Sequence, residues 1–204
     1  MCYSILFGKT MEKLWSMRKV CSFDIAPIYE KVVPYDNVKW DDWVRRRGGY
    51  HEHSRSIPLK WTENLNGFNP EETNKFNQIK FFLDYSRFGN ELDDINNAID
   101  QVDGAGKLIN ALFIKLFAGG IVKDHNDNPS NNDDNLFVKT RRYHIPIVTH
   151  PKVVMRHDDN EYHLEAGYVY ELDNAIGLHG VRNDSLVDRI HLVIDRCPFI
   201  LDKQ

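Results

Sequence analysis

The stretch LINALFIKLF, residues 108–117, marks the change from a helical sequence pattern to a β-rich one. It follows the turn Asp103–Gly106 and is rich in the branched and aromatic residues that favour strands. Six further short β-rich segments follow, separated by turns such as HDDNE and VRNDS. They are GGIVKDHND (119–127), LFVKTRRYHIPIVT (136–149), KVVMRHD (152–158), EYHLE (161–165), GYVYELD (167–173) and VDRIHLVIDRC (187–197). Seven short strands without intervening helices predict a sandwich or jelly roll with helices packed outside it.

The residues before this stretch have a mainly helical pattern. Three segments carry helix caps or an apolar stripe and are expected to be helices: PYDNVKWDDWVRRRGG (34–49), NPEETNKFNQIKFFLDYS (69–86) and NELDDINNAIDQV (90–102). HSRSIPLKW (53–61) is expected to be extended, because Pro58 disfavours helix and the apolar residues around it alternate. We therefore expect one mainly β domain with a helical N-terminal part.

The composition is that of a globular protein. A chain of 204 residues suits one domain, and no apolar run approaches the roughly 20 residues that cross a bilayer. Three scattered cysteines do not make a disulfide framework, so we expect a cytoplasmic protein without a membrane segment. The net charge of -4 makes nucleic acid an unlikely class of partner, although Arg45–Arg47 and Arg141–Arg142 are local basic clusters.

The first chemical signal is the pair His125 and Asp127. In an extended segment, side chains two residues apart share a face with backbones about 7 Å apart, so an imidazole and a carboxylate can meet at one ion. Asp124 and Asn126 would then point the other way. Because such a pair occurs by chance in many chains, a plain polar loop is the alternative.

A third candidate ligand, His179, favours a metal site over a plain polar loop. Two histidines and one carboxylate form the facial triad that binds non-haem Fe(II) and leaves positions open for a cosubstrate and dioxygen. A chelating 2-oxo acid needs a fixed cation for its far carboxylate, and Arg189 has that chemistry. Strand alternation places Arg189, His191 and Val193 on one face.

Three stretches carry a specific resemblance: RYHIPIVTHP, GYVYELDNAIGLHGVRNDS and RIHLVIDRCP. They resemble successive core motifs of the aspartyl/asparaginyl β-hydroxylase family of Fe(II)- and 2-oxoglutarate-dependent oxygenases, over about Leu112 to Pro198. The superfamily also includes bacterial hydroxylases of free amino acids such as proline. The resemblance implies a double-stranded β-helix, a cupin-like jelly roll flanked by α-helices. Residues 107–204 would be its catalytic core, and residues 1–106 mainly helical support on the substrate side.

The resemblance also implies roles for individual residues. His125 and His179 match the iron-binding histidines of the family, and Arg189 matches the arginine that pairs with the far carboxylate of 2-oxoglutarate. Arg142 and His144 match the R-x-H pair that lines the cosubstrate pocket.

Two positions depart from the family pattern. Asp127 stands where the free-amino-acid hydroxylases carry their acid, whereas the animal protein-hydroxylating members use only two histidines. Tyr168 replaces the usual acid after a glycine, which is expected to alter packing rather than chemistry. The implied enzyme uses Fe(II), 2-oxoglutarate and O2 to hydroxylate an unactivated C–H bond. The substrate would be an Asp or Asn side chain in a protein or peptide, or a free amino acid such as proline.

Two other classes fit part of the pattern. A metal-dependent cupin-like enzyme without oxygen chemistry, such as an isomerase, would need the triad but not Arg189. A non-catalytic jelly-roll binding module would use the polar loop 126–135 for recognition.

Most of the other histidines are expected to lie at the surface or in the core rather than to bind a metal. His157 and His163 flank a turn and are expected to face solvent. His51 and His53 are expected to be a surface pair, with a lip over the site as the alternative. His144 is expected either to line the pocket or to pack in the core, and the sequence favours neither position.

The tryptophans and one polar pair are expected to be structural. Trp40, Trp43 and Trp61 are expected to pack in the core. Asp173 and Asn174 are expected to form a turn, the alternative being that they orient His179.

Overall fold

The computed structural model describes residues 16–35, 40, 49–62, 79–82, 84–131, 133 and 135–198. In chain order its elements are β1 (Met17–Ser22), α1 (Ala26–Val32), β2 (Ser54–Thr62), β3 (Ile79–Phe81), α2 (Tyr85–Asp103), β4 (Gly106–Leu116), β5 (Ile121–His125), α3 (Leu136–Lys139), β6 (Arg141–Val148), β7 (Val153–His157), β8 (Asn160–Tyr162), β9 (Tyr168–Leu172), β10 (His179–Asn183) and β11 (Arg189–Pro198). No helix in the described ranges is long and apolar enough to cross a membrane.

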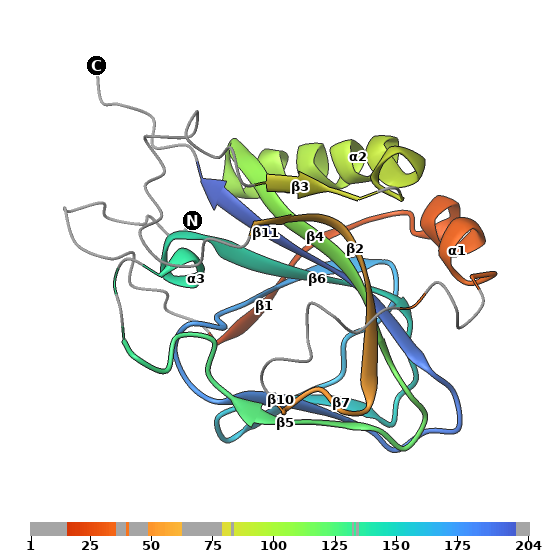
Figure 1. The fold of residues 1–204 in the computed structure, drawn as a ribbon, viewed down its shortest axis with the longest axis vertical. Coiled ribbons are helices and arrows are strands. Elements are labelled where there is room, and N and C mark those ends of the chain that lie inside the picture. Colours follow the sequence, from red (N-terminus) through yellow and green to blue (C-terminus); the bar gives the residue numbers. More distant parts are fainter. Residues whose placement is uncertain are drawn as a thin grey trace.

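The strands form two antiparallel sheets. The larger has the order β1-β9-β6-β11-β4-β2-β3, and the smaller has the order β5-β10-β7-β8. Figure 1 shows the smaller sheet on one side of the larger sheet and α2 on the other. This is the predicted double-stranded β-helix, or jelly roll, with flanking helices.

The outer face of the larger sheet packs against the helices. On β11 the alternate residues Ile190, Leu192 and Ile194 belong to the same buried cluster as side chains of α1 and α2. The helical members of this cluster are Ile28, Val32, Phe88, Leu92, Ile95 and Ile99. The period-two pattern of β11 therefore puts Ile190, Leu192 and Ile194 outside the barrel and Arg189 on the inner face.

The inner face is lined by smaller apolar clusters. Leu112, Ile114 and Val193 from the larger sheet pack with Trp61. Leu116 of the larger sheet packs with three valines of the smaller sheet, namely Val122, Val153 and Val181. The Leu116 cluster joins the two sheets, and polar side chains at other inner positions are left to form the site.

The N-terminal region contributes more strand than its pattern predicts. The expected extended segment 53–61 is β2, and the helix expected over 90–102 is the greater part of α2. The helix expected over 69–86 is wrong at Ile79–Phe81, which form β3 and pair with β2, whereas residues 85 and 86 begin α2. Residues 69–78 of this expected helix lie outside the described residues. Strand β1 also joins the larger sheet. Before Gly106 the described residues thus combine the helices α1 and α2 with the strands β1, β2 and β3.

Other expected elements need smaller corrections. Leu136–Lys139 form a short helix rather than the start of a strand, because Asn135 accepts a hydrogen bond from the Phe137 backbone N–H (2.9 Å) and caps it. Part of the expected turn VRNDS is strand, since Val181–Asn183 belong to β10. The expected helix 34–49 falls outside the described residues except at positions 34, 35, 40 and 49.

We expect Phe88→Ala to lower the free energy of unfolding by about 3–5 kcal/mol, because a fully buried aromatic ring leaves a cavity. Phe88 is 1% exposed, and its ring lies 4.8 Å from that of Phe113. The matched control is Val102→Ala on the same helix, where the side chain is 52% exposed and a change within about 0.5 kcal/mol is expected. Urea unfolding measures both, and equal effects would contradict this assignment of the core.

Candidate functional site

Strand β10 assembles the site, because it lies between β5 and β7 in the smaller sheet. Its first residue, His179, is the register partner of His125 on one side and of His157 on the other. Strand β5 ends at His125, and Asp127 follows in a bend. The pairing thus brings together the three residues that the sequence singled out as ligand types.

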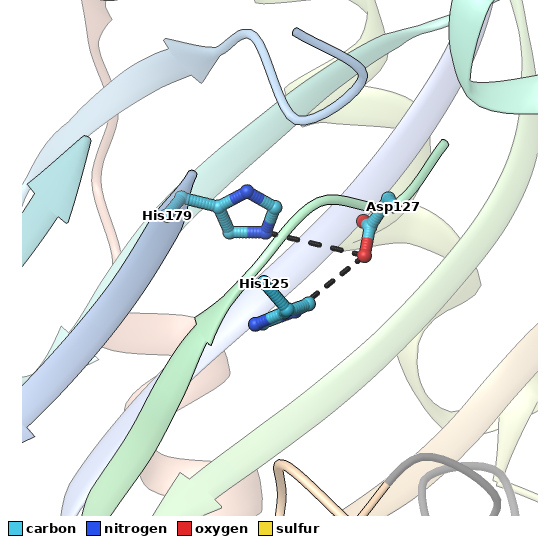
Figure 2. Close-up of side chains that lie close together, drawn as sticks. All are labelled: His125, Asp127 and His179. Carbon is cyan, nitrogen blue, oxygen red and sulfur yellow. Dashed lines mark ion pairs between the residues drawn. The ribbon is translucent and has the colours of Figure 1, made fainter. Parts of the chain in front are cut away.

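His125, Asp127 and His179 converge on one point (Figure 2). The Nε2 atom of His125 lies 3.5 Å from Asp127 Oδ1, and Nε2 of His179 lies 4.0 Å from the same oxygen. One ligand atom from each residue lies within 4.8 Å of the others. Two imidazole nitrogens and one carboxylate oxygen are the donor set that suits Fe(II) and related divalent ions.

The backbone around His125 selects the ring nitrogen that faces the others. Its Nδ1 donates a hydrogen bond to the Lys123 carbonyl (2.8 Å). The proton on Nδ1 leaves the lone pair of Nε2 pointing toward Asp127, which is the arrangement found in metal-binding histidines.

The turn before His179 depends on glycine. Gly177 has φ +79°, and a Cβ there would lie 2.7 Å from Cε1 of His157. Leu178 then exchanges two hydrogen bonds with Asp158: its N–H donates to Oδ1 (2.9 Å), and its carbonyl accepts from the Asp158 N–H (2.7 Å). These contacts fix the start of β10, and with it the direction of the His179 side chain.

The protonation states of two of these groups suit a divalent ion. Burial lowers the pKa of His179 to about 3 and outweighs the attraction of Asp127, so the imidazole is neutral at neutral pH. Burial by itself would raise the pKa of Asp127, but the charge of Arg142 and the hydrogen bond from Asn174 hold it well below its usual range. A neutral imidazole and an ionised carboxylate are the ligand forms, so these groups fit a metal without first losing a proton.

The triad lines a cavity of about 350 Å³ between the sheets. Arg142, His144 and Arg189 line the same cavity. Arg189 is 2% exposed, and its Nη2 donates a hydrogen bond to His191 Nδ1 (2.6 Å). The backbone of Arg189 lies about 20 Å along β11 from that of Asp195, whose side chain contacts Arg142. Arg189 and the Arg142 guanidinium, which comes from β6, therefore lie near opposite ends of β11.

Three expectations about other residues are revised by their burial and contacts. His157 is buried, not solvent-facing, and its Nε2 donates to the Asp173 carbonyl (2.7 Å), whereas His163 is exposed as expected. His51 lines the cavity, with its ring centre 5.1 Å from that of His125, so the alternative of a lip applies to it. Asn174 contacts the triad, but through Asp127 rather than His179.

The tryptophans divide between two environments. Trp40 is buried in the main core as expected. Trp61 packs on the inner cluster and also lines the cavity. Trp43 lies outside the described residues.

Sequence reasoning missed Tyr50 and Asp195. The ring of Tyr50 stacks on His125 with centres 5.1 Å apart, and Asp195 is fully buried against Arg142. A local signal existed for Asp195, because it continues the inward-facing alternation from Arg189 along β11. Tyr50 lies in an irregular segment, where neither helical nor strand periodicity predicts which way a side chain points.

Fold and site together define a class of protein: a double-stranded β-helix with a facial triad of metal-ligand types inside its barrel. The sequence profile of the aspartyl/asparaginyl β-hydroxylase family matches residues 88–197, more than half of the chain. The chain therefore belongs to the aspartyl/asparaginyl β-hydroxylase family, and the resemblance of its motifs is confirmed.

Solved structures agree on the fold. A Pseudomonas putida prolyl-4-hydroxylase superposes with a TM-score of 0.55 at 14% identity, covering 90% of this chain and 93% of that one. An oxidoreductase of the 2OG-Fe(II) oxygenase family from Burkholderia pseudomallei superposes with a TM-score of 0.50 at 12% identity, covering 71% of this chain. This chain spans 66% of the Burkholderia protein. No curated protein sequence matches.

We expect Asp127→Ala to weaken binding of Mn(II) or Fe(II) at least tenfold, because it removes one of three donor groups. The control is Asp124→Ala, since Asp124 pairs with Arg156 and both line a groove separate from the triad cavity. Titration of the metal-free proteins under anaerobic conditions compares the two variants. Equal losses at both positions would mean that this segment does not present Asp127 alone to the ion.

Proposed function

We propose that the protein is an Fe(II)- and 2-oxoglutarate-dependent dioxygenase that hydroxylates an unactivated C–H bond. The observation that carries the proposal is the convergence of His125, Asp127 and His179 within 4.8 Å inside a cavity that a buried arginine also lines. Membership of the aspartyl/asparaginyl β-hydroxylase family supports this class of reaction.

The protein's part in the reaction is to bind and orient. His125, Asp127 and His179 would hold Fe(II) on one side and leave the cavity side for the other ligands. When bound, Fe(II) supplies the dioxygen chemistry that couples decarboxylation of 2-oxoglutarate to succinate with hydroxylation of the substrate. Leu112 and Val193 form an apolar part of the wall of this space.

Arg189 is the proposed partner of the far carboxylate of 2-oxoglutarate. A buried guanidinium binds a carboxylate through two parallel hydrogen bonds, which gives both affinity and direction. The contact with His191 orients the guanidinium plane. His144 also lines the cavity and would contact the cosubstrate, in keeping with the R-x-H motif.

The proposed substrate is an Asp or Asn side chain in a protein or peptide, or a free amino acid such as proline. The family supports the first, and the acid at Asp127 supports the second, since free-amino-acid hydroxylases carry an acid there. Tyr50, His51 and Trp61 line the cavity but lie outside the segment matched by the family. We assign them to the substrate side, because specificity in shared folds resides in such variable segments.

We expect the iron-loaded protein to convert 2-oxoglutarate to succinate and to add one oxygen atom to its substrate. The assay is succinate release, together with a mass screen of amino acids and of Asp-, Asn- and Pro-containing peptides. His179→Ala should abolish both, because the site would lose a ligand. A protein that binds metal but releases no succinate in the presence of any tested substrate would favour a cupin-like isomerase or a binding module.

We expect Arg189→Ala to weaken 2-oxoglutarate binding by tens-fold or more, because loss of a buried charge partner costs about 2–5 kcal/mol. Metal affinity should stay near wild type. Arg189→Lys should restore binding only in part, since lysine lacks the planar fork. Calorimetric titration of the Mn(II)-loaded protein measures this, with the exposed Arg156→Ala as control. An unchanged dissociation constant in Arg189→Ala would remove this role.

We expect His51→Ala to lower kcat/KM for the substrate found in the screen by about tenfold or more, since pocket contacts contribute roughly 1–3 kcal/mol to specificity. Binding of Mn(II) and 2-oxoglutarate should change little, because His51 is not one of the three converging side chains and meets His125 only through an edge-to-face ring contact. His150→Ala, in the turn between β6 and β7, is the control. A variant that loses metal instead would place His51 with the triad.

A further inference from the structure

The two oxygens of the Asp127 carboxylate have different surroundings. Oδ1 faces Nε2 of His125 at 3.5 Å and Nε2 of His179 at 4.0 Å. Oδ2 faces away from the histidines and accepts hydrogen bonds from Nη1 of Arg142 and from Nδ2 of Asn174 (2.7 Å). One oxygen is thus committed to the protein, and the other points to the place where a metal would bind.

Arg142 is itself held by a second carboxylate. Its Nε donates to Asp195 Oδ1 (2.8 Å), and its Nη2 donates to Asp195 Oδ2 (3.1 Å), which is a bidentate pair. Asp195 is fully buried, and its Oδ2 also accepts from Asn110 Nδ2 (2.9 Å). Asn110 in turn accepts from the Thr62 backbone N–H (2.8 Å). The guanidinium is therefore anchored through the larger sheet before it reaches Asp127.

Asn174 makes two hydrogen bonds with Asp127. Its side chain donates to Asp127 Oδ2, and its carbonyl accepts from the Asp127 backbone N–H (3.1 Å). Asn174 is fully buried in the loop between β9 and β10. The same loop leads to His179, so one segment determines the positions of two of the three converging side chains.

We propose that Arg142 and Asn174, backed by Asp195, form a carboxylate cradle that holds Asp127 by Oδ2 and presents Oδ1 alone as a metal ligand. This deepens the proposed function and rests on its metal site, but not on its reaction. Arg142 and Asn174 are then positioning residues. A carboxylate held by one oxygen cannot chelate through both, which leaves an additional coordination position for cosubstrate or dioxygen.

The cradle also gives Arg142 a role different from lining the cosubstrate pocket. Each of its three guanidinium nitrogens donates to a carboxylate of the protein. Its removal should therefore weaken metal binding as well as any contact with 2-oxoglutarate, because Asp127 would lose a charged partner.

The first test measures the affinity of the metal-free protein for Mn(II), with the electron paramagnetic resonance signal of the ion as the readout. Asn174→Ala should bind Mn(II) about 10–100-fold more weakly, the usual effect of removing a group that orients a ligand. Asn174→Asp should lose more, since it replaces a donor with a like charge beside Oδ2. Asp195→Asn should also lose affinity. The exposed Asn160→Ala on β8 is the matched control and should bind as wild type.

The second test supplies the carboxylate from solution. In Asp127→Gly, added formate should restore Mn(II) affinity at least tenfold, because the cradle keeps its donors and formate supplies both oxygens. Chloride at the same ionic strength should not. In the double variant Asp127→Gly with Asn174→Ala, the recovery should be lost. A merely structural role for Asn174 would change the melting temperature but not this rescue.

The outcomes separate the two proposals. Wild-type Mn(II) affinity in Asn174→Ala, or formate rescue that is the same with and without Asn174, would overturn the cradle. If the single variant fails to fold, the rescue comparison in the Asp127→Gly background decides the question. Intact cradle behaviour in a protein that never releases succinate would contradict the proposed hydroxylase and leave the cradle standing.

Discussion

The antiparallel pairing of β10 with β5 and β7 is the constraint on which the site depends. A register partner in an antiparallel ladder lies within about 5.5 Å at Cα, so His179 opposite His125 is already within reach of a shared ion. A slip of one residue would turn His179 to the outer face and bring Gly180 inward. The glycine turn and the Asp158 contacts before β10 prevent that slip.

A hydrogen-bond network of charged and amide side chains stabilises the two buried carboxylates. Asp127 and Asp195 share Arg142, and the amides of Asn174 and Asn110 each donate to one of the acids. Each carboxylate therefore has both a charged and a neutral donor, which offsets the desolvation that isolated buried charges would suffer. These contacts link the larger sheet to Asp127 and to the loop that precedes His179, so packing and ligand geometry are coupled.

Sequence reasoning predicted the fold and the three side chains that converge, because both depend on local signals. Alternation along β11 placed Arg189 inward, and few residue types can serve Fe(II). Contacts between segments far apart in the sequence were beyond it, such as that of Asn174 with Asp127, and so was the burial of His157. The end of β10 was predicted as a turn because it contains residues typical of turns. Asn183 remains in the strand through its backbone, while its side chain donates a hydrogen bond to the Val187 carbonyl (2.8 Å).

The pairing of β1 with β9 and of β2 with β4 has a consequence for how the chain can be divided. A boundary between residues 106 and 107, where the composition changes, cuts through one continuous sheet. The excised C-terminal piece would carry two long unpaired edges, one on β4 and one on β9, whose backbone groups would be open to strands of other molecules. Such a fragment would self-associate rather than fold alone, so the N-terminal strands act as edge protection for the barrel.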